Sequence, residues 1–504
     1  MAHSHEEELA RELTRRGLSR REVLKVGLRL GLGATSMGAL LAACGGAATP
    51  AAPAAAPTAA PAAAAPTAAP APAAEAPTAA PQTSLFDASE GADAQWPQNA
   101  VADPASPTEL SVAHAWDATF FERQKQFDEL FTKRHPNITI KAENTPWGDF
   151  RQKYLTQAAG NALPDIIYVH FSWAQDFAKS GILKSVDDYI AKESNFHLDD
   201  FVKSSLPSYQ RDGKLWVVPY DEGPGVLYYN KDIFDKAGIK YPDDSWTLDG
   251  LRDAAIKMTS GDGPTKVFGL DSLPSPGDSL MAPYGLFPFG AQYLAEPKED
   301  QVLINKPEAV TAMEWWEELR TKGAVPSPAE MQNVAWPPFQ FGRIAMFLQG
   351  SWATPPIQQN AKFKWDIAKW PKGPTKQSTY SAGSGYAITR DTKTADAAWI
   401  YVNDYLSTAG QSYMWGVTGR GSPARLSAWP SYLGSKFAPP GAKYVKESLE
   451  TFASHDILDQ PTAPKVIQAA QPIWDLVVAG QLKVKDALDQ IAAAIEPIIA
   501  ENRG

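Results

Sequence analysis

The sequence has little cysteine, a deficit of positive charge and no long apolar run. Cys44 is the only cysteine among 504 residues, which excludes internal disulfides and any metal site built on several cysteines. Acidic residues outnumber basic residues, 57 to 47, so the surface repels phosphate backbones and we expect no nucleic-acid partner. The charge-free stretch at residues 30–43 is shorter than the roughly 20 residues that a transmembrane helix needs.

The first 43 residues are predicted to be an export signal. Arg20 and Arg21 stand before the charge-free stretch, the order of a basic n-region and a short h-region in a signal peptide. The adjacent arginines resemble the twin-arginine type, which exports proteins that have already folded. A basic amphipathic helix is the alternative for this segment.

Residues 41–45, Leu-Ala-Ala-Cys-Gly, resemble a bacterial lipobox, in which the cysteine takes up a lipid. We therefore predict lipidation of Cys44 and anchoring to the outer face of the cytoplasmic membrane. From residue 45 to 82 the chain is almost wholly Ala, Pro and Thr, a composition that stays extended because nothing in it buries a face. Segment 44–108 is accordingly predicted to be a disordered tether, with the fold beginning at Glu109.

The body of the chain is predicted to be α/β. Its length exceeds what one hydrophobic core usually serves, so we expect at least two domains. Strand patterns at 110–116, 137–142 and 165–169 alternate with helical patterns that end before Pro136 and cover 150–159. Such alternation favours a parallel sheet with helices on its faces.

Tryptophan recurs where these strands end. Trp116, Trp147 and Trp173 follow the first, second and third strand, and ligands of open α/β sheets bind beyond the carboxyl ends of the strands. Tryptophans that served only the core would have no reason to recur at this point of each unit. The chain holds 16 tryptophans, and we assign Trp216, Trp315, Trp316 and Trp399 to packing.

Residues 215–231, from Leu-Trp-Val-Val-Pro-Tyr-Asp-Glu to Tyr-Tyr-Asn-Lys, resemble the segment that crosses between the lobes in extracellular solute-binding proteins of the maltose-binding type. Further segments resemble the same family in chain order: 164–168, 242–247, 342–353 with its Gly-Ser-Trp-Ala, and 383–388 followed by 397–399. Each segment is weak alone, but the ordered set over residues 109–504 is specific.

The resemblance implies a two-lobed periplasmic-binding-protein fold of type II with a hinge. The first lobe would contain 109–220 and 386–430, and the second 221–385 and 431–504, including a helix with apolar spacing over 484–498. It also implies a receptor for an ABC importer, monomeric, without cofactor or metal, whose partners are a carbohydrate and the permease subunits. The tryptophans that follow the predicted strands favour a neutral sugar as the ligand, and the number of tryptophans favours a di- or oligosaccharide.

A sugar receptor needs flat aromatic surfaces and planar hydrogen-bonding groups. The residues predicted to bind the ligand are Trp116, Asp117, Trp147, His170, Trp173, Asp221, Glu222, Trp352, Gly383, Ser384, Gly385, Trp415 and Arg420. Trp352 stands where the family places a stacking tryptophan. Asp221 and Glu222 could instead form a solvated turn, and Arg420 could bridge loops or rest on Trp415; His114 is expected in the core.

Other functions remain open at this point. A receptor for a charged solute would need a carboxylate cage for a polyamine, or several basic residues for a glycerol phosphate. A secreted carbohydrate-active hydrolase or lyase needs two facing carboxyls, whereas Asp221 and Glu222 are adjacent and point to opposite sides of a strand. No H-E-x-x-H motif or P-loop is present, so we predict no catalysis. A structural adhesin would not need the family segments.

Overall fold

The computed structural model describes residues 85–203, 205–295, 300–332, 334–455 and 461–503. The predicted export signal, the lipidation site Cys44 and the tether up to residue 84 lie outside the described residues. Within the described part, no helix is long and apolar enough to cross a membrane.

The first lobe is built on a six-stranded sheet. Its strands are β1 (Thr108–His114), β2 (Ile138–Asn144), β3 (Ile166–His170), β6 (Val218–Pro224), β11 (Thr379–Ile388) and β12 (Ala453–Ser454). The order is β12-β11-β3-β1-β2, with β6 also paired to β11. β1 runs parallel to β2 and β3, as the sequence predicted, while β11 is antiparallel to β3 and β6.

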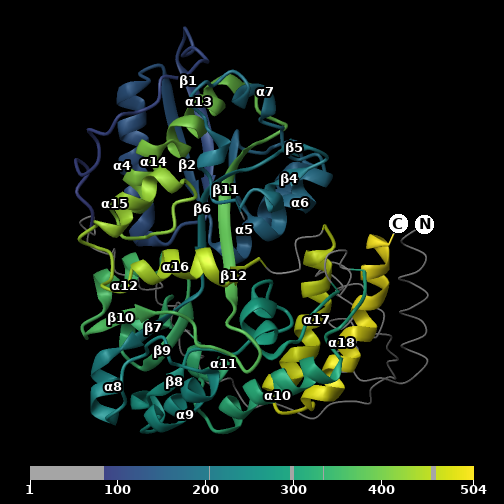
Figure 1. Cartoon of the computed structure of the whole chain (residues 1–504). Coiled ribbons are helices and arrows are strands. Elements are labelled where there is room, and N and C mark those ends of the chain that lie inside the picture. The colour runs from purple at the N-terminus through teal and green to yellow at the C-terminus, as the bar shows by residue number, and fades with distance from the viewer. Residues whose placement is uncertain (1–84, 204, 296–299, 333, 456–460, 504) are drawn as a thin grey trace, which may run out of the picture. The chain divides into compact units, whose positions relative to one another are not determined.

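Helices follow these strands in the predicted order. They are α4 (Ala118–Arg134), α5 (Trp147–Ala159), α6 (Phe171–Lys179), α13 (Ala395–Leu406) and α14 (Thr408–Gln411). Figure 1 shows α4, α13 and α14 beside the six-stranded sheet. Phe120, Phe127 and Phe131 are buried on α4, so the predicted apolar spacing is confirmed. Helix α5 begins at Trp147 rather than Phe150, which places this tryptophan in the first turn of a helix.

The second lobe is built on a four-stranded sheet. Its strands, in spatial order, are β10 (Trp365–Ala368), β7 (Val226–Asn230), β9 (Ile344–Gln349) and β8 (Phe268–Leu270). Its main helices are α8 (Lys231–Ala237), α9 (Leu248–Met258), α10 (Pro307–Thr321), α17 (Ala463–Val478) and α18 (Val484–Ile499). Figure 1 shows α8 and α9 beside this sheet, and α17 beside α18. The short elements are α7 (Asp187–Ile190), β4 (Gln210–Arg211), β5 (Lys214–Leu215), α11 (Pro328–Met331), α12 (Thr354–Asn360), α15 (Trp429–Leu433) and α16 (Lys443–Thr451).

Two sheets with covering helices confirm the predicted α/β, two-lobed fold class. Strands β6 and β11 belong to the six-stranded sheet along their whole length, so the lobe boundaries expected after residues 220 and 385 fall inside strands of that sheet. The helix predicted over 484–498 is present, and its buried face ends at Ile499 rather than Ile498. The tryptophans assigned to packing lie in the core or against it.

The expectation that the fold begins at Glu109 is corrected by the residues before it. Phe86 is buried in the main core, and the ring centroid of Trp96 lies 5.9 Å from that of Phe127. The buried guanidinium of Arg123 donates to the carbonyl oxygens of Asp87 and Glu90. These contacts satisfy polar backbone groups and pack two aromatic rings against the core, so residues 85–108 lie on the first lobe instead of extending as a tether.

Candidate functional site

A chain of hydrogen bonds links four elements of the first lobe, from the start of α5 through β3 and β11 to β6. The hydroxyl of Tyr168, on β3, accepts from Trp147 Nε1 at 3.1 Å and from Ser384 Oγ at 2.8 Å. The backbone N–H of Ser384 donates to Asp221 Oδ1 at 2.7 Å. Because the Tyr168 oxygen accepts both bonds, its own proton is available for a further acceptor.

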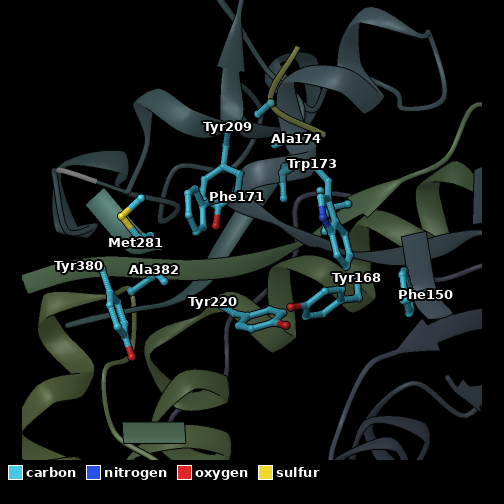
Figure 2. Packing of buried hydrophobic residues seen from close by; sticks show 14 of the residues in the cluster. Phe150, Tyr168, Phe171, Trp173, Ala174, Tyr209, Tyr220, Met281, Tyr380 and Ala382 are labelled. Carbon is cyan, nitrogen blue, oxygen red and sulfur yellow. The ribbon is translucent and has the colours of Figure 1, made fainter. Parts of the chain in front are cut away.

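Trp147 presents an open ring in this group. Its side chain is 50% exposed, and its ring centroid lies 5.3 Å from that of the buried Trp173, with the planes tilted by 31°. Figure 2 shows Trp173 beside Tyr168 and Phe150. His170 lies edge-on to Trp147, and burial lowers its pKa to about 3, so its ring is neutral. One face of Trp147 is therefore supported by protein, and the residue offers a surface on which a flat ligand can stack.

The structure places two other predicted tryptophans in the core. Trp116 donates from Nε1 to Gln124 Oε1 at 3.1 Å, and Trp415 stacks on Tyr220 with centroids 4.7 Å apart. Both are buried, so neither presents an open ring face in this structure. Their role in ligand binding stays a prediction that requires one of these rings to become accessible.

Asp221 and Glu222 lie on β6 and reach different partners. Burial raises the pKa of Asp221 to about 7, against the opposing effect of the nearby Arg420. Glu222 accepts from Ser381 Oγ, and its Oε1 lies 3.2 Å from His455 Nε2. The two carboxyls thus act separately, Asp221 towards the Ser384 hydrogen-bond chain and Glu222 towards the segment that follows β12.

Gly383 and Gly385 let β11 approach β6 closely. A Cβ atom at Gly383 would lie 2.3 Å from the carbonyl oxygen of Asp221 and 2.6 Å from Glu222 Oε2. At Gly385 it would lie 2.3 Å from the carbonyl oxygen of Val218. Only glycine fits at these distances, and Ser384 between them is held against the Asp221 carboxylate as a result.

We expect Gly383→Ala to destabilise the protein by about 1–3 kcal/mol, because the methyl group forces β11 and β6 apart. Chemical denaturation measures this change. Gly148→Ala is the matched control, since nothing lies within 4 Å of the added methyl group. Equal stability of Gly383→Ala and wild type would contradict the close approach of the two strands.

Arg420 joins the two lobes. Its Nη1 donates to Asp117 Oδ2 at 3.0 Å and to the carbonyl oxygen of Trp352 at 3.3 Å. Asp117 is the N-cap of α4, where it accepts from the Phe120 N–H. Arg420 is 6% exposed, and the central carbon of its guanidinium lies 4.1 Å from the Phe120 ring centroid. Arg420 therefore ties the start of α4 in the first lobe to the segment after β9 in the second.

Trp352 is half-buried and lies flat against its own chain. A Cβ atom at Gly350 would lie 2.1 Å from the Trp352 ring, so glycine at 350 is required for this ring position. The ring stacks on Tyr380 with centroids 6.2 Å apart and planes 29° apart. The neighbouring Ser351 hydroxyl lies 2.6 Å from that of Ser422 in the first lobe. Trp352 is thus the aromatic surface of the second lobe next to the lobe junction.

A cavity of about 90 Å³ lies next to Trp352 in the second lobe. Its lining residues are Leu270, Asp271, Ser272, Asp278, Leu280, Tyr284, Trp316, Leu348, Gln349, Trp370 and Tyr380. None of these residues, nor Tyr168, was predicted from the sequence to bind a ligand. Asp271 directly follows β8. The expectation that ligands bind beyond the carboxyl ends of strands, which selected residues in the first lobe, would have pointed to it as well. Within the described residues, no three His, Cys, Asp or Glu side chains are grouped to hold a metal ion.

A comparison of the sequence with known protein families identifies the family of this chain. The family model of bacterial extracellular solute-binding proteins matches residues 115–412, more than half of the chain. The chain belongs to this family. Membership implies a binding protein that acts outside the cytoplasm, and the matched range includes the Tyr168 hydrogen-bond chain, Trp352 and the second-lobe cavity.

Individual relatives are distant. A protein of Brucella abortus (strain 2308) is 27% identical over 305 residues, covering 58% of this chain and 71% of that protein. A lactose-binding protein of Rhizobium radiobacter is 25% identical over 324 residues, covering 62% and 74%. Among solved structures, an ABC substrate-binding protein from Listeria monocytogenes in complex with cycloalternan has a TM-score of 0.70 at 24% identity, covering 78% of this chain and 99% of that one. At this identity the structural likeness shows the fold alone.

Proposed function

We propose that this protein captures a di- or oligosaccharide outside the cytoplasm and delivers it to the permease of an ABC importer. One observation carries the proposal: the open ring of Trp147 stands beside the Tyr168 hydroxyl, which is linked through Ser384 to Asp221. An aromatic surface next to a row of hydroxyl and carboxyl groups is the chemistry that a sugar ring requires.

The faces of a pyranose are apolar and its rim carries hydroxyls. Trp147 is exposed in the first lobe and Trp352 is half-buried in the second, and each offers a surface for stacking. Arg420 draws the lobes together through Asp117 and Trp352. Closure would bring both tryptophans onto one ligand, and two such surfaces suit more than one sugar ring.

The names of relatives support a carbohydrate. The Rhizobium radiobacter relative is a lactose-binding protein, and the Listeria monocytogenes structure holds cycloalternan. A relative from Escherichia coli (strain K12) binds sn-glycerol-3-phosphate and is 29% identical over 275 residues. A phosphate ligand needs several basic donors, whereas Arg420 already bonds Asp117. The carbohydrate is therefore the better-supported ligand.

The rest of the proposal rests on the sequence. We infer export by the segment 1–43, lipidation of Cys44 at the outer face of the cytoplasmic membrane, and a tether over residues 45–84 that holds the body away from the membrane. The protein would act as a monomer and release its sugar unchanged. Labelling of cells with a lipid precursor, compared between wild type and Cys44→Ala, tests the anchor.

A melting-temperature screen of the purified protein tests the ligand class. The panel contains neutral and amino oligosaccharides, polyamines and glycerol phosphates. A ligand at 100 times its Kd stabilises by about 2.7 kcal/mol, which raises Tm by a few degrees in a protein of this size. A shift with sugars, recovered unchanged, is expected. A shift only with polyamines or glycerol phosphates contradicts the proposal, and consumption of a sugar shows an enzyme.

A further inference from the structure

The second-lobe cavity touches the proposed sugar site. Tyr380 lines the cavity and also stacks under Trp352, and its hydroxyl donates to Gln349, another lining residue. A complete pocket for a small molecule is about 300–1,000 Å³, whereas this cavity has about 90 Å³. It therefore has room for a substituent of a ligand whose rings lie elsewhere, against Trp352.

Two carboxyl groups line the cavity. Asp271 accepts from the Leu348 N–H at 3.1 Å and from the Ser272 hydroxyl at 2.6 Å. Asp278 accepts from the Leu280 N–H at 3.0 Å through Oδ1. Among the described residues that line the cavity, none is lysine, arginine or histidine. No basic side chain of the lining therefore balances these two carboxyls.

The walls are aromatic, and one of them carries a free donor. Trp370 is 1% exposed and lines the cavity, and its Nε1–H has no partner in the described part of the chain. Trp370 stacks on Trp316 with centroids 6.3 Å apart and lies edge-on to Tyr284 at 6.1 Å. A buried donor without a partner costs free energy, so a ligand that supplies an acceptor here is favoured.

We propose that this cavity binds a protonated amino group of the carbohydrate, so that the ligand is an amino sugar. The ammonium group donates to Asp271 and Asp278 between aromatic walls, and a neighbouring hydroxyl of the same ring accepts from Trp370 Nε1. This inference rests on the proposed function and changes it in one respect: the sugar carries a positive charge.

A cation fits the cavity better than a neutral hydroxyl. Aromatic faces attract cations, and two carboxyls without a basic partner favour a ligand that brings positive charge. Burial raises the pKa of Asp271 to about 7 and raises that of Asp278. A bound ammonium group lowers the pKa of both carboxyls, so binding of the ammonium form releases protons from Asp271 near neutral pH.

Three disaccharides with the same β-1,4 backbone test the proposal on the whole protein. Chitosan disaccharide carries ammonium groups, cellobiose carries hydroxyls in their place, and N,N′-diacetylchitobiose carries acetamides. Isothermal titration measures the Kd of each at pH 6.5, where the amino groups of chitosan disaccharide are still largely protonated, and proton release is obtained from buffers with different ionisation enthalpies. We expect chitosan disaccharide to bind at least tenfold tighter than cellobiose.

Two variants assign the effect to the cavity. Asp278→Asn should remove most of the preference for the amino sugar, while cellobiose binding stays within about twofold. Asp253→Asn on α9 is the control, since that carboxyl is exposed. Cellobiose is the control for other titrating groups, because it would meet the same residues of the proposed site without bringing an ammonium group.

The outcomes separate this inference from the proposed function. Neutral sugars that bind as tightly as amino sugars, with no effect of Asp278→Asn, overturn the amino-group inference and leave the sugar receptor standing. If no sugar of the melting-temperature screen binds, both the amino-group inference and the proposed function are overturned. An amino-sugar preference that persists in Asp278→Asn places the charge recognition elsewhere and overturns the assignment to this cavity.

Discussion

Replacing Trp352 by alanine is expected to weaken carbohydrate binding on the order of 100-fold, the loss seen when a central aromatic contact is truncated. The ring is the half-buried aromatic surface of the second lobe, stacked on Tyr380 and adjacent to the cavity. Its removal takes away the surface on which the sugar ring would stack and lets water enter between the lobes. Isothermal titration with the sugar found in the melting screen measures the change.

Two variants separate binding from folding. Trp315→Ala removes a half-buried tryptophan of α10 whose Nε1 bonds Asp249, and it should leave the Kd within about twofold. Gly350→Ala keeps Trp352 but adds a methyl group 2.1 Å from its ring, so we expect it to weaken binding by displacing the ring. Wild-type affinity in Trp352→Ala, with an unchanged far-ultraviolet spectrum, would remove Trp352 from the site.

Local pattern predicted the first lobe well because its elements have strong periodicity. The strand predicted at 165–169 corresponds to β3, whose four residues from Ile166 to Val169 are apolar or aromatic, and every residue of β3 is buried. The helix before Pro136 buries Phe120, Phe127 and Phe131 at the expected spacing. One helix boundary was wrong: α5 begins at Trp147 rather than Phe150, directly after Pro146, a position that pattern alone did not resolve.

Burial could not be predicted, because it depends on what packs against a residue from elsewhere in the chain. Trp116 and Trp415 are far apart in sequence, yet their ring centroids lie 6.3 Å apart in one aromatic core. Trp147 has a similar position after its strand but remains 50% exposed. Residues 85–108 were likewise assigned to the tether because their composition is polar, whereas their carbonyls are satisfied by Arg123.

The second lobe was predicted mainly from the family resemblance, and this limited which of its site residues could be predicted. The family pattern pointed to Trp352 but carried no information on the cavity, which combines residues after β8, after β10 and at the start of β11. Asp271 directly follows a strand, so it could have been predicted by the argument that selected Trp116. Trp370 and Tyr380 could not have been predicted in this way, because only the folded chain brings them to the same cavity as Asp271.

Replacing Arg420 by alanine is expected to weaken sugar binding at least 100-fold and to favour the open arrangement of the lobes. Arg420 is the buried residue that bonds both Asp117 and the carbonyl of Trp352. Breaking one partner of a buried ion pair costs about 3–5 kcal/mol. Because the ligand requires the closed arrangement, a lower closed population raises the apparent Kd in proportion.

Arg420→Lys distinguishes charge from geometry. Lysine keeps the positive charge but presents a single ammonium group rather than a planar fork, so one of the two bonds should be lost and an intermediate affinity is expected. Arg390→Ala on the first-lobe surface is the control for removal of an arginine. Small-angle scattering with and without saturating sugar reports closure: wild type should contract on binding, and Arg420→Ala should contract less. An Arg420→Ala protein that binds and contracts like wild type would show that Arg420 does not hold the lobes together.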